Sequence, residues 1–223
     1  MNGAAQAGAV YVRTSVLTPN PAWVVVTEPT IGGSGGPRQG DRFGFRILVG
    51  DLNLDGYQDV VVSARGVRID KDCEQGEVFV LYGPWTLVPS PTTPPYAGGA
   101  IGIVEDVYHR NNPPNDTYGD RFGFRIALGD PNQDGYPDLV VGSPYSRIPP
   151  YPNQNGEAYV YWGPSFSAWL ELVLPWDSPG SAALLSIDRL WGGTSHAATS
   201  RTGSEAPMMT SSCRSLQLRQ RCS

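Results

Sequence analysis

Short apolar segments separated by turn-forming residues dominate the hydrophobic pattern of the chain. The segments are rich in Val, Tyr, Phe and Ile and are bounded by Gly, Pro and Asp, which is typical of β-strands. We expect strands at about 43–49, 59–63, 77–82 and 100–105, and again at about 122–128, 138–142, 157–162 and 182–187. Helical periodicity is missing from these regions. The pattern therefore predicts an all-β fold built from two groups of four strands.

The two groups of strands belong to an internal sequence repeat. The segment 40–47 recurs letter for letter at 119–126, and the same spacing continues without a gap through the acidic segments that follow. A further match joins 76–84 to 156–164, and a shorter copy of this part stands at 8–12. Four strands per repeat are typical of a β-propeller blade. The sequence therefore predicts a partial β-propeller.

The repeat boundaries define the expected domain organisation. We expect one propeller segment over residues 1–190, with a partial blade at 8–28 and whole blades at 40–106 and 119–188. The repeat then stops, and the polar stretch 191–223 is expected to be an irregular, disordered tail. Because stacked repeats bury their faces on neighbours, we expect further blades or a second copy of the chain to cover so short a segment.

Each whole repeat contains a nine-residue acidic loop, Asp-x-Asn-x-Asp-Gly-Tyr-x-Asp. Oxygen-bearing side chains at positions 1, 3, 5 and 9 turn inward, the glycine at position 6 permits the turn, and position 7 offers its carbonyl. Calcium takes six to eight such oxygen ligands, and converging carboxylates repel each other without a cation. The predicted ligands are Asp51, Asn53, Asp55, Tyr57 (carbonyl) and Asp59 in the first loop, and Asp130, Asn132, Asp134, Tyr136 (carbonyl) and Asp138 in the second.

Other interpretations of the acidic loops fit less well. The oxygen-only donor set favours calcium over zinc, and magnesium would require stricter octahedral geometry. An EF-hand does not fit, because position 12 is Val62 or Val141 where that motif needs glutamate. Ordinary turns without a metal are the remaining alternative, and two matching loops in register disfavour it. The sequence therefore predicts two Ca²⁺ sites.

The order of these motifs resembles the FG-GAP repeat of integrin α-subunits over about residues 8–188. The Phe-Gly pairs are Phe43-Gly44 and Phe122-Gly123. The Gly-Ala-Pro part is Gly142-Ser143-Pro144 in the second unit, while the first unit departs from it with Ser63-Ala64-Arg65. The resemblance implies a seven-bladed propeller with calcium loops on one face and ligand-binding loops on the opposite face. It also implies an extracellular or cell-surface location and a role in adhesion through a protein partner.

Similar repeats also stand beside catalytic domains in secreted enzymes such as the glycosylphosphatidylinositol-specific phospholipase D. The alternative function is therefore a non-catalytic propeller segment of a secreted hydrolase.

Composition and charge limit the kinds of partner and the cellular locations that the sequence allows. The 27 Gly and 21 Pro residues agree with a turn-rich fold, and the net charge of −5 argues against a nucleic-acid partner. No apolar run reaches the roughly 18 residues of a transmembrane helix, so we expect no membrane span in this chain. Residues 1–8 lack the features of a signal peptide, so secretion would require a longer chain or another export route. The tripeptide Asn115-Asp116-Thr117 is an N-glycosylation acceptor and predicts a glycoprotein if the chain is secreted.

Catalytic groups are scarce in the sequence. The segment 32–36 fits the Gly-x-Ser-x-Gly pattern of hydrolases but lacks the strand before it and the helix after it. The two histidines, His109 and His196, lie in irregular segments and assemble no triad. Arg42 and Arg121, beside the Phe-Gly pairs, are expected to form structural salt bridges. We therefore expect a binding module and not an enzyme.

Overall fold

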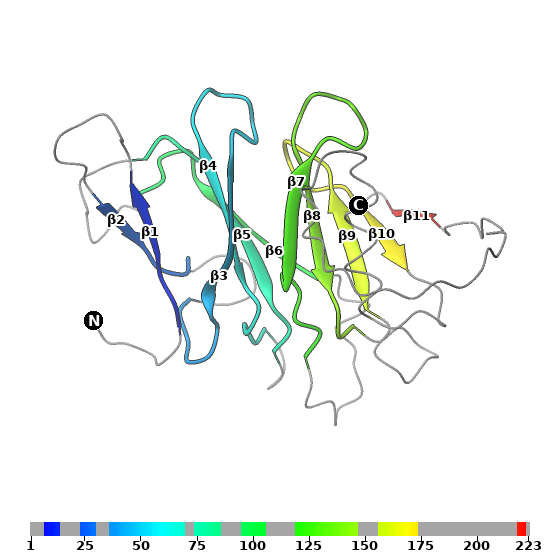
Figure 1. Ribbon diagram of the computed structural model, residues 1–223, viewed down its shortest axis with the longest axis horizontal. Helices are drawn as coiled ribbons and strands as arrows, with labels where there is room; N and C mark the ends of the chain where they lie inside the picture. Colours follow the sequence, from blue (N-terminus) through cyan, green and yellow to red (C-terminus); the bar gives the residue numbers. More distant parts are fainter. Residues whose placement is uncertain are drawn as a thin grey trace, which may run out of the picture.

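The chain forms three antiparallel sheets that stand side by side, with the N-terminal sheet at the left of Figure 1 and the C-terminal sheet at the right. The computed structural model describes residues 7–13, 23–29, 36–69, 74–85, 95–105, 119–146, 156–173 and 218–221. The sheets do not close into a ring. These residues contain no helix, and hence none long and apolar enough to cross a bilayer. The expected all-β partial propeller is confirmed.

The strands within each sheet follow the order of the chain. The first sheet pairs β1 (Val10–Arg13) with β2 (Trp23–Val26). The middle sheet contains β3 (Phe43–Gly50), β4 (Asp59–Ala64), β5 (Glu77–Leu81) and β6 (Ala100–Val104). The third sheet contains β7 (Arg125–Gly129), β8 (Asp138–Ser143), β9 (Glu157–Tyr161), β10 (Trp169–Val173) and β11 (Leu218–Arg221). Four consecutive antiparallel strands per sheet are the pattern of a propeller blade.

The two inner strands of the middle sheet, β4 and β5, are buried at every position, which explains their runs of consecutive apolar residues. Successive side chains of a strand point to opposite faces. Val61 and Val80 pack in a core shared with the third sheet, whereas Val62 and Phe79 pack in a core shared with the first sheet. Both cores therefore lie between sheets, and each sheet depends on its neighbour for burial.

The same backbone contact joins the sheets at both junctions. The Phe43 N–H donates to the carbonyl of the residue before Gly8 at 2.7 Å, and the Phe122 N–H donates to the carbonyl of the residue before Gly76 at 2.8 Å. A Cβ added to Gly8 or Gly76 would lie 2.0 or 2.1 Å from the carbonyl oxygen of Phe43 or Phe122. Both glycines also have a positive φ. Only glycine fits this close approach of two backbones.

The aromatic rings of the Phe-Gly pairs lie in the cores beside this contact. The Phe43 ring lies 5.6 Å from Phe79, and the Phe122 ring lies 5.6 Å from Tyr159 and 6.1 Å from Tyr161, measured between centroids. Offset and edge-on ring pairs at such distances stabilise a core beyond the area that they bury. Each Phe-Gly pair therefore anchors its blade to the preceding one.

The third sheet differs from the expected strand positions. Its fourth strand is β10, and the segment 182–187 that was expected to form this strand lies outside the described residues. The connection before β10 is short because it closes in a tight turn, in which the Phe166 N–H donates to the Trp162 carbonyl at 2.9 Å. At the other end of the chain, β11 pairs with β10 within the stretch that was expected to be irregular. The other residues of 191–223 lie outside the described part, and their disorder stays a prediction.

We predict that Gly76→Ala lowers the free energy of unfolding by about 3–5 kcal/mol, because the new Cβ combines left-handed strain with a backbone clash. Gly99→Ala is the matched control, since Gly99 also has a positive φ but nothing lies within 4 Å of its added Cβ. In this control, left-handed backbone strain alone should lower the free energy of unfolding by only about 1–2 kcal/mol. Urea unfolding followed by tryptophan fluorescence measures both values, and equal losses would contradict the close-approach explanation.

Candidate functional site

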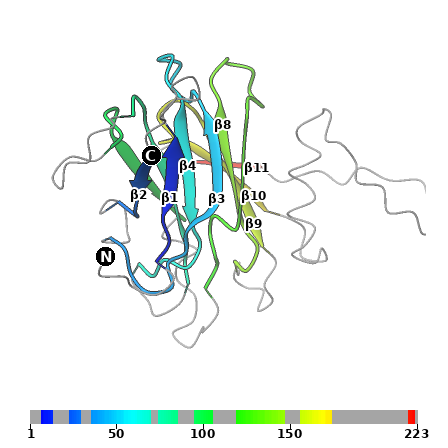
Figure 2. The same ribbon diagram turned by 60° about the vertical axis from the view of Figure 1, so that its left-hand side comes forward.

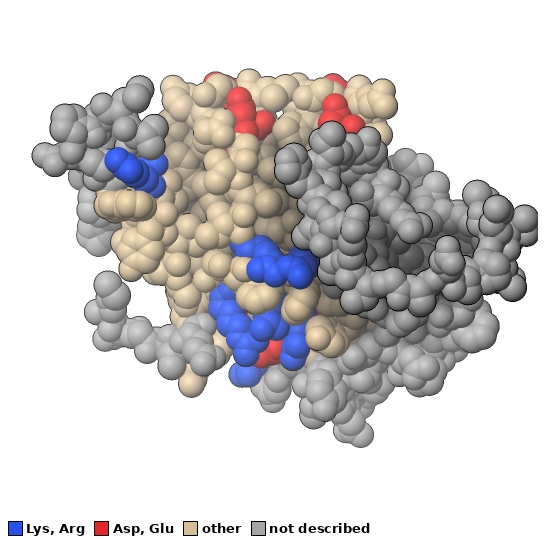
Figure 3. Space-filling model, in the orientation of Figure 1, with Lys and Arg blue, Asp and Glu red and all other residues tan. Residues whose placement is uncertain are grey.

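Two acidic loops connect the first and second strands of the middle and third sheets. One runs from β3 to β4 and the other from β7 to β8, and both project from the same end of the sheets in both ribbon views (Figures 1 and 2). Acidic side chains appear at two places along that end of the surface in Figure 3. The repeat therefore brings the two loops predicted to bind metal onto one face of the molecule.

In the first loop, acidic side chains fold the backbone around themselves. Asp51 accepts the N–H of Asp55 at 3.1 Å and the N–H of Gly56 at 2.9 Å, one on each carboxylate oxygen. The Asn53 amide oxygen accepts the same Asp55 N–H at 3.1 Å, and its amide nitrogen donates to the Asp55 carboxylate at 3.0 Å. Asp55 also accepts the Tyr57 N–H at 2.8 Å. The first three predicted side-chain ligands are therefore brought together.

The second loop repeats this geometry bond for bond. Asp130 accepts the N–H groups of Asp134 and Gly135, both at 3.0 Å. The Asn132 side chain accepts the Asp134 N–H at 3.2 Å and donates to the Asp134 carboxylate at 2.8 Å. The Tyr136 N–H donates to Asp134 at 2.9 Å. Two loops with the same sequence pattern thus adopt the same local structure.

The last acid of each loop is buried at the start of the second strand, and here the two loops differ. Asp59 accepts the N–H of Leu52 and the N–H of Gly83, both at 2.8 Å, one on each oxygen. Asp138 accepts the N–H of Gly163 at 2.9 Å on Oδ1, while its Oδ2 is buried and has no hydrogen bond of normal geometry. The reason is that proline 131, which lacks an N–H, stands where the first loop has Leu52. The second loop therefore contains a buried carboxylate oxygen without a full partner.

The acids of each loop interact electrostatically. Burial is the main cause that raises the pKa of Asp59, and the charges of Asp55 and Asp51 raise it further. Burial likewise raises the pKa of Asp138, with added repulsion from the two other acids of its loop. A cation bound in either loop would offset this repulsion. Among the described residues, however, no three His, Cys, Asp or Glu side chains are already grouped closely enough to hold a metal ion.

A second acidic cluster, which the sequence analysis missed, lies buried between the middle and third sheets. It consists of Glu105, Asp120 and Glu157, which are all at most 1% exposed. The Tyr159 hydroxyl lies 2.6 Å from Glu157 Oε2 and 3.1 Å from Glu105 Oε1. Burial raises the pKa of Glu105 well above its usual value, and the charges of Asp120 and Glu157 raise it further. Burial next to two other acids therefore favours the protonated form of Glu105.

The repeat contains the signal that could have revealed this cluster. Glu28, Asp41 and Glu77 occupy the equivalent positions at the junction of the first and middle sheets, and all three are buried. A hydrogen bond joins the side chains of Asp41 and Glu28. Carboxylates at matching places beside otherwise apolar strands indicate paired acids between blades.

Comparison with known proteins identifies the repeat. The model of the FG-GAP repeat matches residues 43–81 and 122–161, which include both acidic loops and both Phe-Gly pairs. The chain therefore contains two FG-GAP repeats. These repeats form a non-catalytic module.

The relatives that carry the repeat fall into two kinds of protein. The chain is 32% identical to integrin alpha-6 of Homo sapiens over 126 residues, which are 54% of this chain and 9% of that protein. It is 30% identical to integrin alpha-PS3 of Drosophila melanogaster over 129 residues, which are 57% of this chain and 9% of that protein. It is 34% identical to the phosphatidylinositol-glycan-specific phospholipase D of Rattus norvegicus over 122 residues, which are 55% of this chain and 13% of that protein. The similarity to the phospholipase covers the repeat region only, and the chain matches only a small part of each relative.

We predict that Asp59→Asn and Asp138→Asn have different costs in metal-free buffer. Asp59→Asn leaves one of two buried N–H donors facing an amide nitrogen and should lower the free energy of unfolding by about 1–3 kcal/mol. Asp138→Asn removes a buried oxygen that lacks a full partner and should change that energy by less than about 1 kcal/mol. Urea unfolding in the presence of EDTA measures both variants. An equal decrease in the free energy of unfolding for both variants would show that the incomplete hydrogen bonding of Asp138 Oδ2 has no energetic effect.

We also predict that Glu105→Gln removes part of the pH dependence of stability. The folded-state pKa of Glu105 is raised, so the folded chain binds a proton that the unfolded chain has lost, and wild-type stability falls as pH rises through this window. Within the window the slope is about 1.4 kcal/mol per pH unit, and glutamine does not titrate. Between pH 5 and pH 8, the free energy of unfolding of the variant should therefore rise relative to that of the wild type, as measured by urea unfolding. Parallel curves for the two proteins would contradict the raised pKa.

Proposed function

We propose that this chain is a calcium-binding, non-enzymatic module that binds a protein partner in an extracellular or cell-surface setting. The observation that carries the proposal is the pair of acidic loops, which share one hydrogen-bonding geometry and lie on one face. Neither loop uses its acids in an ion pair with a described cationic side chain. Two such loops without a counter-charge favour a cation as their natural partner.

The residues proposed to hold calcium are the side chains at positions 1, 3, 5 and 9 and the carbonyl at position 7. They are Asp51, Asn53, Asp55, Asp59 and the Tyr57 carbonyl in the first loop, and Asp130, Asn132, Asp134, Asp138 and the Tyr136 carbonyl in the second. A bound calcium ion would supply positive charge that ties the loop to the start of the second strand. The proposed role of the ion is therefore structural.

The donor chemistry fits calcium at both loops. All donors are oxygen atoms, and the flexible coordination of calcium accommodates carboxylates, an amide and a carbonyl in one irregular loop. In the second loop the buried Asp138 Oδ2 has no full hydrogen-bond partner. A cation is the kind of partner that such an oxygen lacks. Although the Asn132 N–H also interacts with the Asp138 carboxylate, the incomplete satisfaction of this oxygen supports a metal in the second loop independently of the sequence pattern.

A protein partner is supported by the relatives and by the outer face of the first sheet. Tyr11 and Trp23 on that face are 60% and 61% exposed, and Val25 lies beside them on β2. Large apolar side chains on an uncovered sheet face fit a further blade or a second copy of this chain. Adhesion is the role proposed from the similarity to integrin alpha-6. The glycosylation acceptor at Asn115 lies outside the described residues and stays a prediction.

The alternative proposal is a non-catalytic propeller segment of a secreted hydrolase. It is favoured by the similarity to the phospholipase D, which matches the integrin similarity in identity and extent. The coding sequence on either side of this region distinguishes the two proposals. A catalytic domain there would favour the hydrolase, whereas additional repeats followed by a membrane span would favour the adhesion protein.

We predict that calcium raises the melting temperature of the full chain. At a concentration of about 100 times Kd, each site stabilises the folded state by about 2.7 kcal/mol, which corresponds to about 5–10 °C for a chain of this size. Asp55→Asn or Asp134→Asn should each remove part of the shift, and the double variant should remove it all. Gln133→Asn is the matched control, because Gln133 lies in the second loop but is not a proposed ligand. Calorimetric scans with calcium and with EDTA measure the shift, and its absence in the wild type would refute the proposed function.

A further inference from the structure

Five arginine side chains from two neighbouring blades gather at the end of the sheets opposite the acidic loops. Phe43 pairs with Ala64 at that end of the middle sheet, whereas Gly50 pairs with Asp59 at the end that carries the first acidic loop. The arginine cluster consists of Arg42, Arg46, Arg65, Arg121 and Arg125. Figure 3 shows basic side chains gathered low on this face.

The repeat explains four of the five arginines. Arg42 and Arg121 precede the two Phe-Gly pairs, and Arg46 and Arg125 follow them at equivalent positions. Arg65 has no counterpart, because the second unit has Pro144 at that position. The first unit thus departs from its repeat by adding a cation where the two blades meet.

Aromatic rings hold the guanidinium groups in place. Arg65 lies 4.3 Å from the ring centroid of Phe45 and 5.4 Å from that of Phe124, and the two rings lie 5.5 Å apart. Arg46 lies over Phe45 at 4.7 Å, and Arg125 lies over Phe124 at 5.8 Å. Stacking of this kind orders a guanidinium group before any ligand binds.

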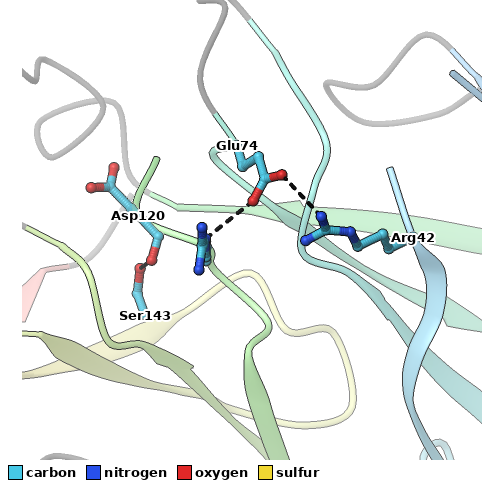
Figure 4. A network of polar contacts seen from close by, with 5 residues as sticks. Arg42, Glu74, Asp120 and Ser143 are labelled. Atoms are coloured by element: carbon cyan, nitrogen blue, oxygen red, sulfur yellow. Dashed lines mark hydrogen bonds and ion pairs between the residues drawn. The ribbon is translucent and has the colours of Figure 1, made fainter. Parts of the chain in front are cut away.

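Positive charge predominates in the arginine cluster, where five guanidinium groups lie around the Glu74 carboxylate. Glu74 pairs with the cluster, at 3.5 Å from Arg42 and 3.1 Å from Arg121 (Figure 4). In Figure 4 the carboxylate of Asp120 points away from this pair of contacts. Two of the three guanidinium nitrogens of Arg65, Nε and Nη1, are buried without a hydrogen-bond partner. Burial lowers the pKa of Arg65, and the charges of Arg42 and Arg121 lower it further.

We propose that the arginine cluster is a docking site for the carboxylate groups of an acidic segment of a protein partner, bound on the face opposite the calcium loops. Glu74 already seats one carboxylate between arginines of two blades, which shows that the spacing accepts this group. Arginine donates two parallel hydrogen bonds to a carboxylate, and the stacked groups are ordered in advance. This inference rests on the proposed function as a protein-binding module.

The surroundings of the cluster favour a short acidic segment over a long polyanion. The chain carries a net charge of −5, so negative charge prevails outside the cluster. A long sulfated glycan would extend beyond the five arginines onto surface that repels it. A few carboxylates on one peptide segment, by contrast, fit within the cluster.

The test measures binding of a fluorescein-labelled hexaglutamate peptide to the full 223-residue chain in calcium-containing buffer, by fluorescence anisotropy at low and high ionic strength. A hexaglutamine peptide is the uncharged control and should not bind. Arg46→Gln combined with Arg125→Gln should weaken hexaglutamate binding about tenfold or more, because charge-assisted hydrogen bonds are lost. Arg13→Gln is the matched control, since Arg13 is exposed on β1, and it should leave the affinity unchanged.

Two further variants keep the test independent of folding. Arg125→Gln alone changes an exposed side chain, so it reports on binding even if the double variant is unstable. Arg65→Lys keeps the charge but loses the planar fork and its stacking, and it should also weaken binding. The melting temperature of each variant in calcium identifies any that fail to fold.

Three results would overturn the inference. The first is no hexaglutamate binding by a chain that calcium still stabilises, which would leave the proposed function intact. The second is hexaglutamate binding that the arginine variants leave unchanged but that Asp55→Asn with Asp134→Asn abolishes, which would show carboxylates bridged by calcium at the acidic loops. The third is binding of a heparin hexasaccharide that the arginine variants weaken while hexaglutamate does not bind, which would identify a sulfated glycan as the ligand. Conversely, arginine-dependent hexaglutamate binding without any calcium stabilisation would refute the calcium proposal and support the docking site.

Discussion

The close approach of two backbones at each blade junction is the constraint on which the other features of this structure depend. A glycine at the start of one strand lies against the carbonyl of the phenylalanine that begins the next blade, and no room remains for a Cβ. The adjoining N–H to carbonyl bond fixes the height of each sheet relative to its neighbour. Because neighbouring sheets cannot shift past each other along their strands, equivalent loops of the two blades lie at the same end of the sheets. The acidic loops therefore share one face, and the arginines of two blades meet at the opposite end.

Departures from the repeat, more than the repeat itself, give each blade its particular chemistry. Proline in place of Leu52 leaves an oxygen of Asp138 without a full partner. Arg65, in place of a proline, adds the fifth cation to the cluster between the blades. Tyr159, in place of Phe79, brings a hydroxyl to the buried acids. Each substitution preserves the backbone contact, so chemistry can vary while the architecture is kept.

Much of the fold could be predicted from the sequence because its signals are local or repeated. The apolar runs of β4 and β5, glycine at the turns and the spacing of the acids all lie within short segments. The position of β10 could not be predicted, because it depends on a tight turn closed by Phe166 instead of the long loop of the first unit. The arginine cluster and the buried acids were also missed. Their members are distant in sequence and meet only when the blades stack.

The opposite charges at the two ends of the blades connect the two proposals physically. The acidic loops contribute much of the negative charge that gives the chain its net value of −5. Two bound calcium ions would each add two positive charges and take that value to −1. At low ionic strength, where screening is weak, the long-range repulsion of an acidic partner would then decrease, while the local attraction of the arginines would be unchanged. Calcium at one face would therefore favour the approach of an acidic segment to the other face without any change of shape.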